Sequence, residues 1–249
     1  MKTTGNTILV TGGASGIGRA LAERWHAAGN RVIIAGRRKE AIDAVLAAHA
    51  GMAGYVLDLE DSQAIKRFAE QVVQDHPALN VLVNNAGIMV AESMTEDAWL
   101  DAAERTVATN LLGPLRLTAA LMPHLRHASN PAIVNVSSGL AFVPLTRTPT
   151  YSATKAAVHS WSLTLRARLK DQGIEVIELA PPAVQTDLMP GQATNPNIMT
   201  LAAFTDETMA LFAQEPTPAE ITVQQVLFLR NAEREGRFDK TFEMLNQAH

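Results

Sequence analysis

The fold is indicated most clearly by one stretch near the start of the chain, Thr7-Ile8-Leu9-Val10-Thr11-Gly12-Gly13-Ala14-Ser15-Gly16-Ile17-Gly18-Arg19. Its apolar, β-branched beginning predicts a buried strand, and its glycines predict a tight turn that opens a helix. Glycine at 12, 16 and 18 lets the backbone approach a pyrophosphate, to which the helix N-terminus offers free N–H groups. The spacing Gly-x-x-x-Gly-x-Gly is a variant of the commoner Gly-x-Gly-x-x-Gly. The alternative is a purely structural turn between strand and helix.

The same alternation of strand and helix continues to about residue 180. Short apolar runs predict strands at 7–10, 31–35, 53–57, 79–83, 132–136 and 174–179, and amphipathic stretches between them predict helices at 18–28, 62–75, 95–127 and 149–171. This order predicts βαβ units, hence a doubly wound α/β Rossmann fold with a mostly parallel sheet covered by helices on both faces. We expect six strands. A seventh is left open, because 217–249 shows no clear strand and reads as helices at 219–235 and 240–248. No repeat or linker is visible, so 1–249 is expected to form a single domain.

The composition excludes several classes of protein. Hydrophobic residues make up 47% and charged residues 18%, enough apolar side chain for a sizeable core. The net charge is −4 without a basic stripe, which argues against a nucleic-acid partner. Without cysteine, disulfides, thiolate metal sites and a cysteine nucleophile are excluded. Neither a signal peptide's apolar core nor an apolar run of roughly 20 residues is present, so we expect a cytoplasmic protein without a membrane span.

A second stretch carries candidate catalytic groups, Ile133-Val134-Asn135-Val136-Ser137-Ser138 followed by Thr150-Tyr151-Ser152-Ala153-Thr154-Lys155. Tyr151 and Lys155 are spaced to share one face of a helix. An ammonium beside a phenol favours the phenolate, so we expect the pKa of Tyr151 to fall from about 10 toward neutrality and make it an acid–base group. Ser138, at the end of a predicted strand, would hydrogen-bond a substrate carbonyl. The alternative is a surface Tyr–Lys pair that follows an ordinary core strand.

The residues after the second predicted strand bear on the choice of a dinucleotide cofactor. An NAD site places an acid there for the ribose 2′-hydroxyl. This chain has Arg37 and Arg38 instead, which suit a 2′-phosphate and favour NADP(H) over NAD(H). The alternative is that these cations belong to a solvated loop or a helix start.

Three further positions follow predicted strands or interrupt a predicted helix. Asp58 either accepts a hydrogen bond from an adenine amino group or serves as a helix cap or turn residue. Asn84-Asn85-Ala86-Gly87 suits backbone contact with the central sugars of a cofactor, or is simply a turn. Asn110 lowers helix propensity inside a long predicted helix, so we expect it to distort the helix and expose a carbonyl to water.

In this order and spacing, residues 11–18 and 84–87, Asn110, Ser138 and the Tyr151–Lys155 pair resemble the short-chain dehydrogenase/reductase family over roughly residues 5 to 190. Residues 137–144 further resemble a bacterial subgroup associated with lipoteichoic-acid D-alanylation operons, which supplies no substrate. The resemblance implies an NADP(H)-dependent enzyme that interconverts a carbonyl and an alcohol without a metal. A non-catalytic NADP(H) sensor on the same fold is the alternative, and dehydratase or epimerase chemistry is a third possibility without a visible motif.

The resemblance also implies roles for individual residues. Tyr151 would be the acid in reduction and the base in oxidation, Lys155 would lower its pKa and hold the nicotinamide ribose, Ser138 would orient the carbonyl, and Asn110 would hold a water. The cofactor would contact Gly12, Ser15, Gly16, Ile17, Gly18, Arg37, Arg38, Asp58, Asn85, Ala86, Gly87, Tyr151, Lys155, Val184 and Thr186.

The second half of the chain departs from the family pattern in two places. Pro182 stands where the family has glycine in Pro-Gly-x-Val-x-Thr, and proline fixes φ and removes an N–H, so the local turn is expected to differ. The family usually ends in a seventh strand used in tetramers; without one we expect a homodimer formed by the helices near 95 and 149, where Ala153, Ala156 and Ala157 allow close approach.

Apolar, methionine-rich residues between 188 and 214 correspond to the family's mobile substrate lid, although a core-packing helix explains them equally. With Met89, Leu140 and Phe142 beside the site, they suit a hydrophobic pocket for an apolar small molecule. His159 is expected to face a neighbouring helix and is assigned no function.

Overall fold

The structure, a computed structural model, describes residues 1–95 and 99–247. Within these ranges seven parallel strands form one sheet: β1 (Thr7–Thr11), β2 (Arg31–Gly36), β3 (Ala53–Val56), β4 (Val81–Asn84), β5 (Ala132–Val136), β6 (Glu175–Leu179) and β7 (Glu220–Ile221). Their order across the sheet is β3-β2-β1-β4-β5-β6-β7. The winding reverses between β1 and β4, where a doubly wound sheet leaves a crevice at the carboxyl ends of its strands. The predicted doubly wound fold is confirmed.

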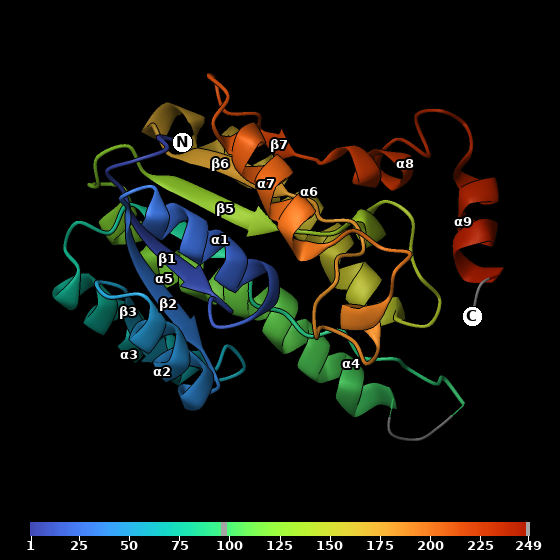
Figure 1. Cartoon of the computed structure of the whole chain (residues 1–249), viewed down its shortest axis with the longest axis horizontal. Coiled ribbons are helices and arrows are strands. Elements are labelled where there is room, and N and C mark those ends of the chain that lie inside the picture. The colour runs from blue at the N-terminus through green and yellow to red at the C-terminus, as the bar shows by residue number, and fades with distance from the viewer. Residues whose placement is uncertain (96–98, 248–249) are drawn as a thin grey trace.

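Helices cover both faces of the sheet (Figure 1). Alternation along the strands explains this, because Ile8 and Val10 of β1 enter one hydrophobic cluster and Leu9 enters the other. The helices within the described ranges are α1 (Gly16–Ala27), α2 (Lys39–Ala48), α3 (Ser62–Asp75), α4 (Trp99–Val107), α5 (Gly113–Leu125), α6 (Pro149–Leu169), α7 (Leu201–Phe212), α8 (Leu227–Arg230) and α9 (Phe238–Gln247). None of them combines the length and apolar character needed to cross a membrane.

The C-terminal segment differs from the prediction. The expected helix at 219–235 is wrong: the segment contains β7, a short 3-10 turn and α8. The expectation of six strands is corrected by β7, which pairs with β6 through Glu178↔Glu220 and Leu179↔Ile221. A strand of two residues is too short to show an alternating pattern in the sequence, so it can be recognised only from its pairing with β6 in the structure.

Two predicted helices extend beyond the described residues. The expected helix at 95–127 spans 96–98, which lie outside the described ranges, and its remainder forms α4, a π-helical turn (Ala108–Leu112) and α5. The expected helix at 240–248 corresponds to α9, with residue 248 again outside.

Helix α9 lies at one end of the molecule, beyond α8 (Figure 1). Its Asn246 side chain accepts a hydrogen bond from the backbone N–H of Thr146 at 2.7 Å and donates one to the Pro144 carbonyl at 3.2 Å. The loop between β5 and α6 is therefore held by a helix about a hundred residues later in the chain.

Candidate active site

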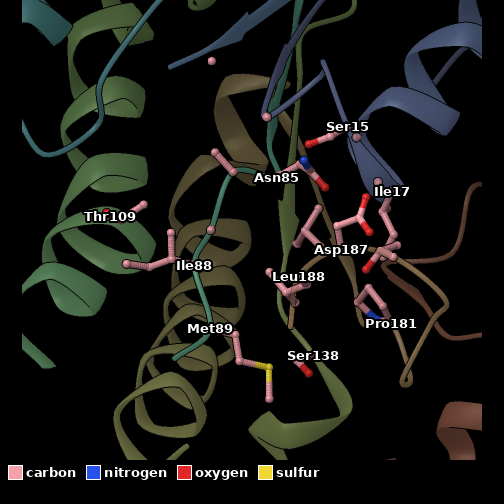
Figure 2. Close-up of a pocket in the computed structure, with 18 of the residues that line it drawn as sticks. Ser15, Ile17, Asn85, Ile88, Met89, Thr109, Ser138, Pro181, Asp187 and Leu188 are labelled. Carbon is pink, nitrogen blue, oxygen red and sulfur yellow. The ribbon is translucent and has the colours of Figure 1, made fainter. Parts of the chain in front are cut away.

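A cleft of about 550 Å³ lies along the carboxyl edge of the sheet. Figure 2 shows Ser15 and Ile17 toward one end and Met89 and Ser138 toward the other. All the residues predicted to contact a cofactor line this cleft: Gly12, Ser15, Gly16, Ile17, Gly18, Arg37, Arg38, Asp58, Asn85, Ala86, Gly87, Tyr151, Lys155, Val184 and Thr186. The fold thus gathers residues from the ends of six strands into one elongated groove.

The glycine turn between β1 and α1 is a cradle that side chains would fill. Gly12 and Gly16 adopt positive φ values of 67° and 52°, which favour glycine. A Cβ on Gly18 would lie 2.5 Å from the Gly12 carbonyl oxygen and 2.3 Å from Nδ2 of Asn85. The backbone and the N-terminus of α1 therefore face the cleft directly, an arrangement that suits a phosphate group.

The loop after β4 is fastened to this turn. Asn85 donates its side-chain N–H to the Thr11 carbonyl at 2.8 Å, and the Thr11 hydroxyl accepts from the backbone N–H groups of Asn85 and Ala86. The Asn85 side chain thus acts in the structure as a tie between β1 and β4. Sequence reasoning missed Thr11 as its partner.

The two arginines that follow β2 border the cleft in different settings. Arg37 pairs with Glu60 at 3.5 Å, and Glu60 also accepts from the Thr109 hydroxyl at 3.0 Å. Arg38 is exposed and occupies the N-cap position of α2. Its backbone is therefore at a helix start, as the alternative interpretation of these cations expected. Asp58 lines the cleft and also accepts from the Glu60 N–H at 3.0 Å, which makes it a turn residue as well. Sequence reasoning missed Glu60.

The Tyr151–Lys155 pair is buried, with 7% and 4% of each residue exposed, so the surface-pair alternative is excluded. Both residues lie on α6. Lys155 donates to the Val136 carbonyl at 2.8 Å, and its Nζ lies 5.5 Å from the centre of the Tyr151 ring. The Ser138 hydroxyl accepts a hydrogen bond from the Leu140 N–H, and its side chain is close enough to Tyr151 to influence the pKa of the phenol. Three candidate catalytic groups therefore meet at one end of the cleft.

The expected direction of the Tyr151 pKa is wrong for this arrangement. Burial raises the pKa of Tyr151 to about 12, and the neighbouring Ser138 side chain opposes this only in part. Burial also lowers the pKa of Lys155 to about 8, with the Glu178 carboxylate opposing the shift. Removing the charged form from water is the largest cause of both shifts, and Lys155 donates its hydrogen bond to the Val136 carbonyl.

Asn110 lies behind the cleft, in the π-helical turn that joins α4 to α5. Its side chain accepts from the Ile88 N–H and donates to the Ile88 carbonyl, each at 2.8 Å. It also approaches the Thr154 hydroxyl at 3.4 Å. The predicted distortion of the helix at this position is present, and it lets Asn110 hold the backbone beyond Gly87 in place.

The loop after β6 forms one wall of the cleft. Pro181, Pro182, Val184 and Thr186 line it, and Val184 forms a parallel bridge with Met199. Within the described chain no residue of 181–186 adopts a positive φ, which is compatible with proline at 182.

Beyond this loop, the 188–214 segment divides into two parts. Leu188 and Gln192 line the cleft, whereas Phe204 and Phe212 of α7 are buried in the core against α1, with Phe212 edge-on to Trp25. Met89 lines the cleft as expected. Phe142 instead packs against His159 and Arg230.

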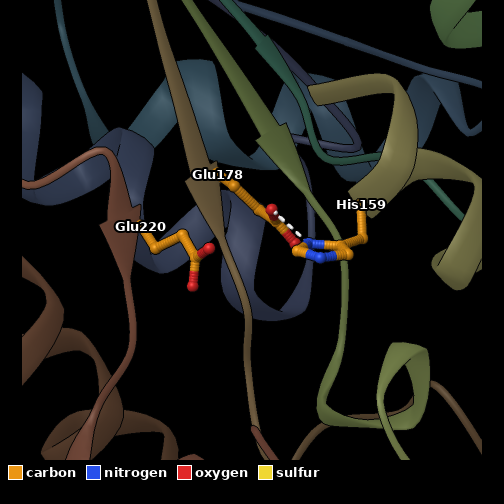
Figure 3. Close-up of side chains that lie close together, drawn as sticks. All are labelled: His159, Glu178 and Glu220. Carbon is orange, nitrogen blue, oxygen red and sulfur yellow. Dashed lines mark hydrogen bonds and ion pairs between the residues drawn. The ribbon is translucent and has the colours of Figure 1, made fainter. Parts of the chain in front are cut away.

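A second polar group missed by sequence reasoning lies beside the catalytic end. Glu178 of β6 is fully buried and accepts a hydrogen bond from the Ser137 hydroxyl. It also hydrogen-bonds His159 (Figure 3). His159 therefore faces the sheet rather than a neighbouring helix, which corrects the expectation. The available signal was a glutamate in the middle of the predicted core strand, after the apolar residues Val176 and Ile177 and before Leu179.

Comparison with known proteins identifies the family of the chain. The short chain dehydrogenase family matches residues 6–197. The chain belongs to that family. The resemblance inferred from the motifs is confirmed.

One relative and two solved structures are similar to this chain over most of its length. The uncharacterized oxidoreductase DltE of Bacillus subtilis (strain 168) is 39% identical over 251 residues, which cover 99% of this chain and 98% of that protein. A short-chain dehydrogenase from Streptomyces avermitilis is 29% identical with a TM-score of 0.81, covering 98% and 97% of the two chains. One from Sphingobium yanoikuyae, solved in complex with NADPH, is 27% identical with a TM-score of 0.77, covering 93% and 94%.

Proposed function

We propose that this short chain dehydrogenase is an NADP(H)-dependent oxidoreductase that interconverts a carbonyl and an alcohol. The observation that carries the proposal is the meeting of Ser138, Tyr151 and Lys155 in the same cleft as the glycine turn. The similarity to an oxidoreductase and to a dehydrogenase solved with NADPH supports it. The glycine turn leaves a space that a Cβ on Gly18 would fill, and Arg37 and Arg38 line the same cleft. Together these features fit an NADP(H) molecule.

Each of the four candidate catalytic residues then has a defined role. NADPH, when it binds in the cleft, would supply the hydride. Tyr151, protonated at neutral pH, donates its proton to the substrate oxygen, and Ser138 orients that oxygen by a hydrogen bond. Lys155 would hold the ribose hydroxyls of the cofactor and stabilise the phenolate that forms. Asn110 fixes the Ile88 backbone through two hydrogen bonds, and it would hold a water that leads from Lys155 to solvent.

The substrate end of the cleft is apolar, with Met89, Val90 and Leu188 in its lining. We assign it to an apolar carbonyl or alcohol, covered by the 188–214 segment as a lid that α7 anchors to the core. The exposed Ala153 and Ala156 on α6 lie on the surface through which we expect two copies of the chain to associate as a homodimer.

The cofactor assignment predicts a preference for NADPH over NADH that depends on Arg37 and Arg38. Each guanidinium makes a charge-assisted bond to the 2′-phosphate worth about 1.5–3 kcal/mol, so changing both to alanine should weaken NADPH binding by roughly 100-fold or more. NADH has no 2′-phosphate, so its affinity should barely change and serves as the internal control. Fluorescence titration measures both. Equal affinities in the unaltered protein would refute the assignment.

The two perturbed pKa values predict how turnover depends on pH. The pKa of Tyr151, about 12, keeps its proton available across the neutral range, while the pKa of Lys155, about 8, means that its charge is complete well below pH 8 and is lost above it. Carbonyl reduction should therefore be level at lower pH and decline as pH rises through about 8. Alcohol oxidation requires the phenolate and should gain from rising pH while Lys155 remains charged. Initial rates with saturating cofactor test this, and a reduction rate that climbs through pH 8 contradicts it.

A further inference from the structure

The buried Glu178 carboxylate joins the two elements that carry the catalytic groups. One of its oxygens accepts from the hydroxyl of Ser137, which directly precedes Ser138. The other accepts from Nδ1 of His159 at 2.8 Å, one helical turn beyond Lys155 on α6 (Figure 3). A single side chain therefore bridges the loop after β5 to the helix of Tyr151 and Lys155.

A carboxylate in this position is costly. Glu178 has no exposed surface, and a buried charge is tolerated only where hydrogen bonds and opposite charges satisfy it. An apolar side chain of similar size would fill the same place in β6 without that cost. The fold thus retains a charge that packing alone does not require, directly behind the catalytic end of the cleft.

A metal ion does not account for it. Ligand atoms of His159, Glu178 and Glu220 lie within 4.8 Å of one another. However, both Glu220 oxygens accept from Arg230, at 2.8 and 2.9 Å, and both Glu178 oxygens are bonded to Ser137 and His159. Among the described residues, these protein donors already occupy every carboxylate oxygen that would bind a cation.

We propose that Glu178 is a positioning residue for the proposed carbonyl–alcohol reaction: through Ser137 and His159 it sets the placement of Ser138 relative to Lys155. The inference rests on the proposed function, because those groups matter only if they act on a substrate or cofactor.

The charged groups around Glu178 define its electrostatic effect. His159 of α6 hydrogen-bonds Glu178, and Glu220 is its register partner on β7. The charges of Lys155 on α6 and Arg230 on α8 also interact with it. Among them, Glu178 is the group that opposes the effect of burial on the Lys155 pKa. Removing its charge should therefore make Lys155 lose its proton at lower pH.

The test compares Glu178→Gln with Glu220→Gln, the same change one strand away on the same face of the sheet. For Glu178→Gln we expect a loss of roughly ten-fold or more in kcat, an almost unchanged NADPH affinity, and an alkaline limb of the reduction profile displaced to lower pH by about half a unit or more. Glu220→Gln removes an ion pair with Arg230 and is expected to lower the melting temperature without moving that limb.

A readout without turnover separates this inference from the proposed function. The Lys155 ammonium can be titrated by NMR in protein carrying 13C-labelled lysine, with Lys155→Met identifying its signal. A lower titration midpoint of Lys155 in Glu178→Gln than in the unaltered protein supports the positioning role of Glu178. If no carbonyl substrate turns over, that result refutes the proposed function and leaves this support for the positioning role in place. An unchanged midpoint together with unchanged kcat overturns the inference.

Should Glu178→Gln fail to fold, the partially exposed His159 carries the test. His159→Asn can keep a donor near the position of Nδ1 and should retain most of kcat, whereas His159→Ala should lose it to a similar extent as Glu178→Gln. Equal activity of the two His159 variants, in folded protein, also overturns the proposal.

Discussion

Replacing Tyr151 by phenylalanine is expected to abolish measurable carbonyl reduction while NADPH still binds. The change removes one hydroxyl from a residue that is 7% exposed and leaves the ring in its packing. The lost group is the proposed proton donor for the substrate oxygen, and general acid catalysis of this kind contributes about 10²–10⁴-fold to the rate. NADPH affinity should change by less than about two-fold, since the contacts of the glycine turn and the arginines remain.

The chain provides a matched control in its second tyrosine. Tyr55 also bears a bonded hydroxyl, which donates to Asp75 at 2.8 Å, but it packs against Phe68 on the α3 side of the sheet, away from the cleft lining. Tyr55→Phe should therefore leave kcat unchanged. If Tyr151→Phe retains activity within ten-fold of the unaltered protein, the proposed acid–base role is wrong.

Replacing Gly18 by alanine is expected to eliminate useful NADPH binding. The added Cβ would lie 2.5 Å from the Gly12 carbonyl oxygen, which is backbone and cannot turn aside as a flexible side chain can. The turn must open, so the first N–H groups of α1 move away from the phosphates. The loss of about 3 kcal/mol of these contacts weakens binding by roughly 100-fold. Overpacking by about 2 kcal/mol should also lower the melting temperature by roughly 4–8 °C.

Gly36→Ala is the control for this substitution. Gly36 lines the same cleft, but a Cβ there meets no described atom within 4 Å. Its melting temperature should match that of the unaltered protein. A Gly18→Ala protein with unaltered melting and NADPH affinity would show that the glycine turn does not hold the cofactor.

Local patterns explain why the sequence predicts the cleft well. The glycine turn, Arg37 and Arg38 each lie at the end of a predicted strand, and parallel strands bring their carboxyl ends to one edge. Tyr151 and Lys155 share a helix face through their spacing alone. Such features depend on neighbours in the chain, so the sequence contains them directly.

The features that sequence reasoning missed depend on contacts between distant segments. The Tyr151 pKa follows from how deeply α6 is buried, which its weak amphipathic pattern does not show. The position of Glu178 depends on its hydrogen bonds with Ser137 and His159. The strand β7 is recognised only by its pairing with β6. None of these partners is adjacent to the residue it defines.

The bond between Asn246 and Thr146 has a consequence for genetics. A nonsense mutation that removes α9 would leave the seven strands and the cofactor groove in place, because β7 ends at Ile221. It would release the segment that leads from Ser138 to Tyr151. Such truncated alleles should yield a folded, nucleotide-binding protein that no longer processes its substrate, so an expression-level screen would score them as normal.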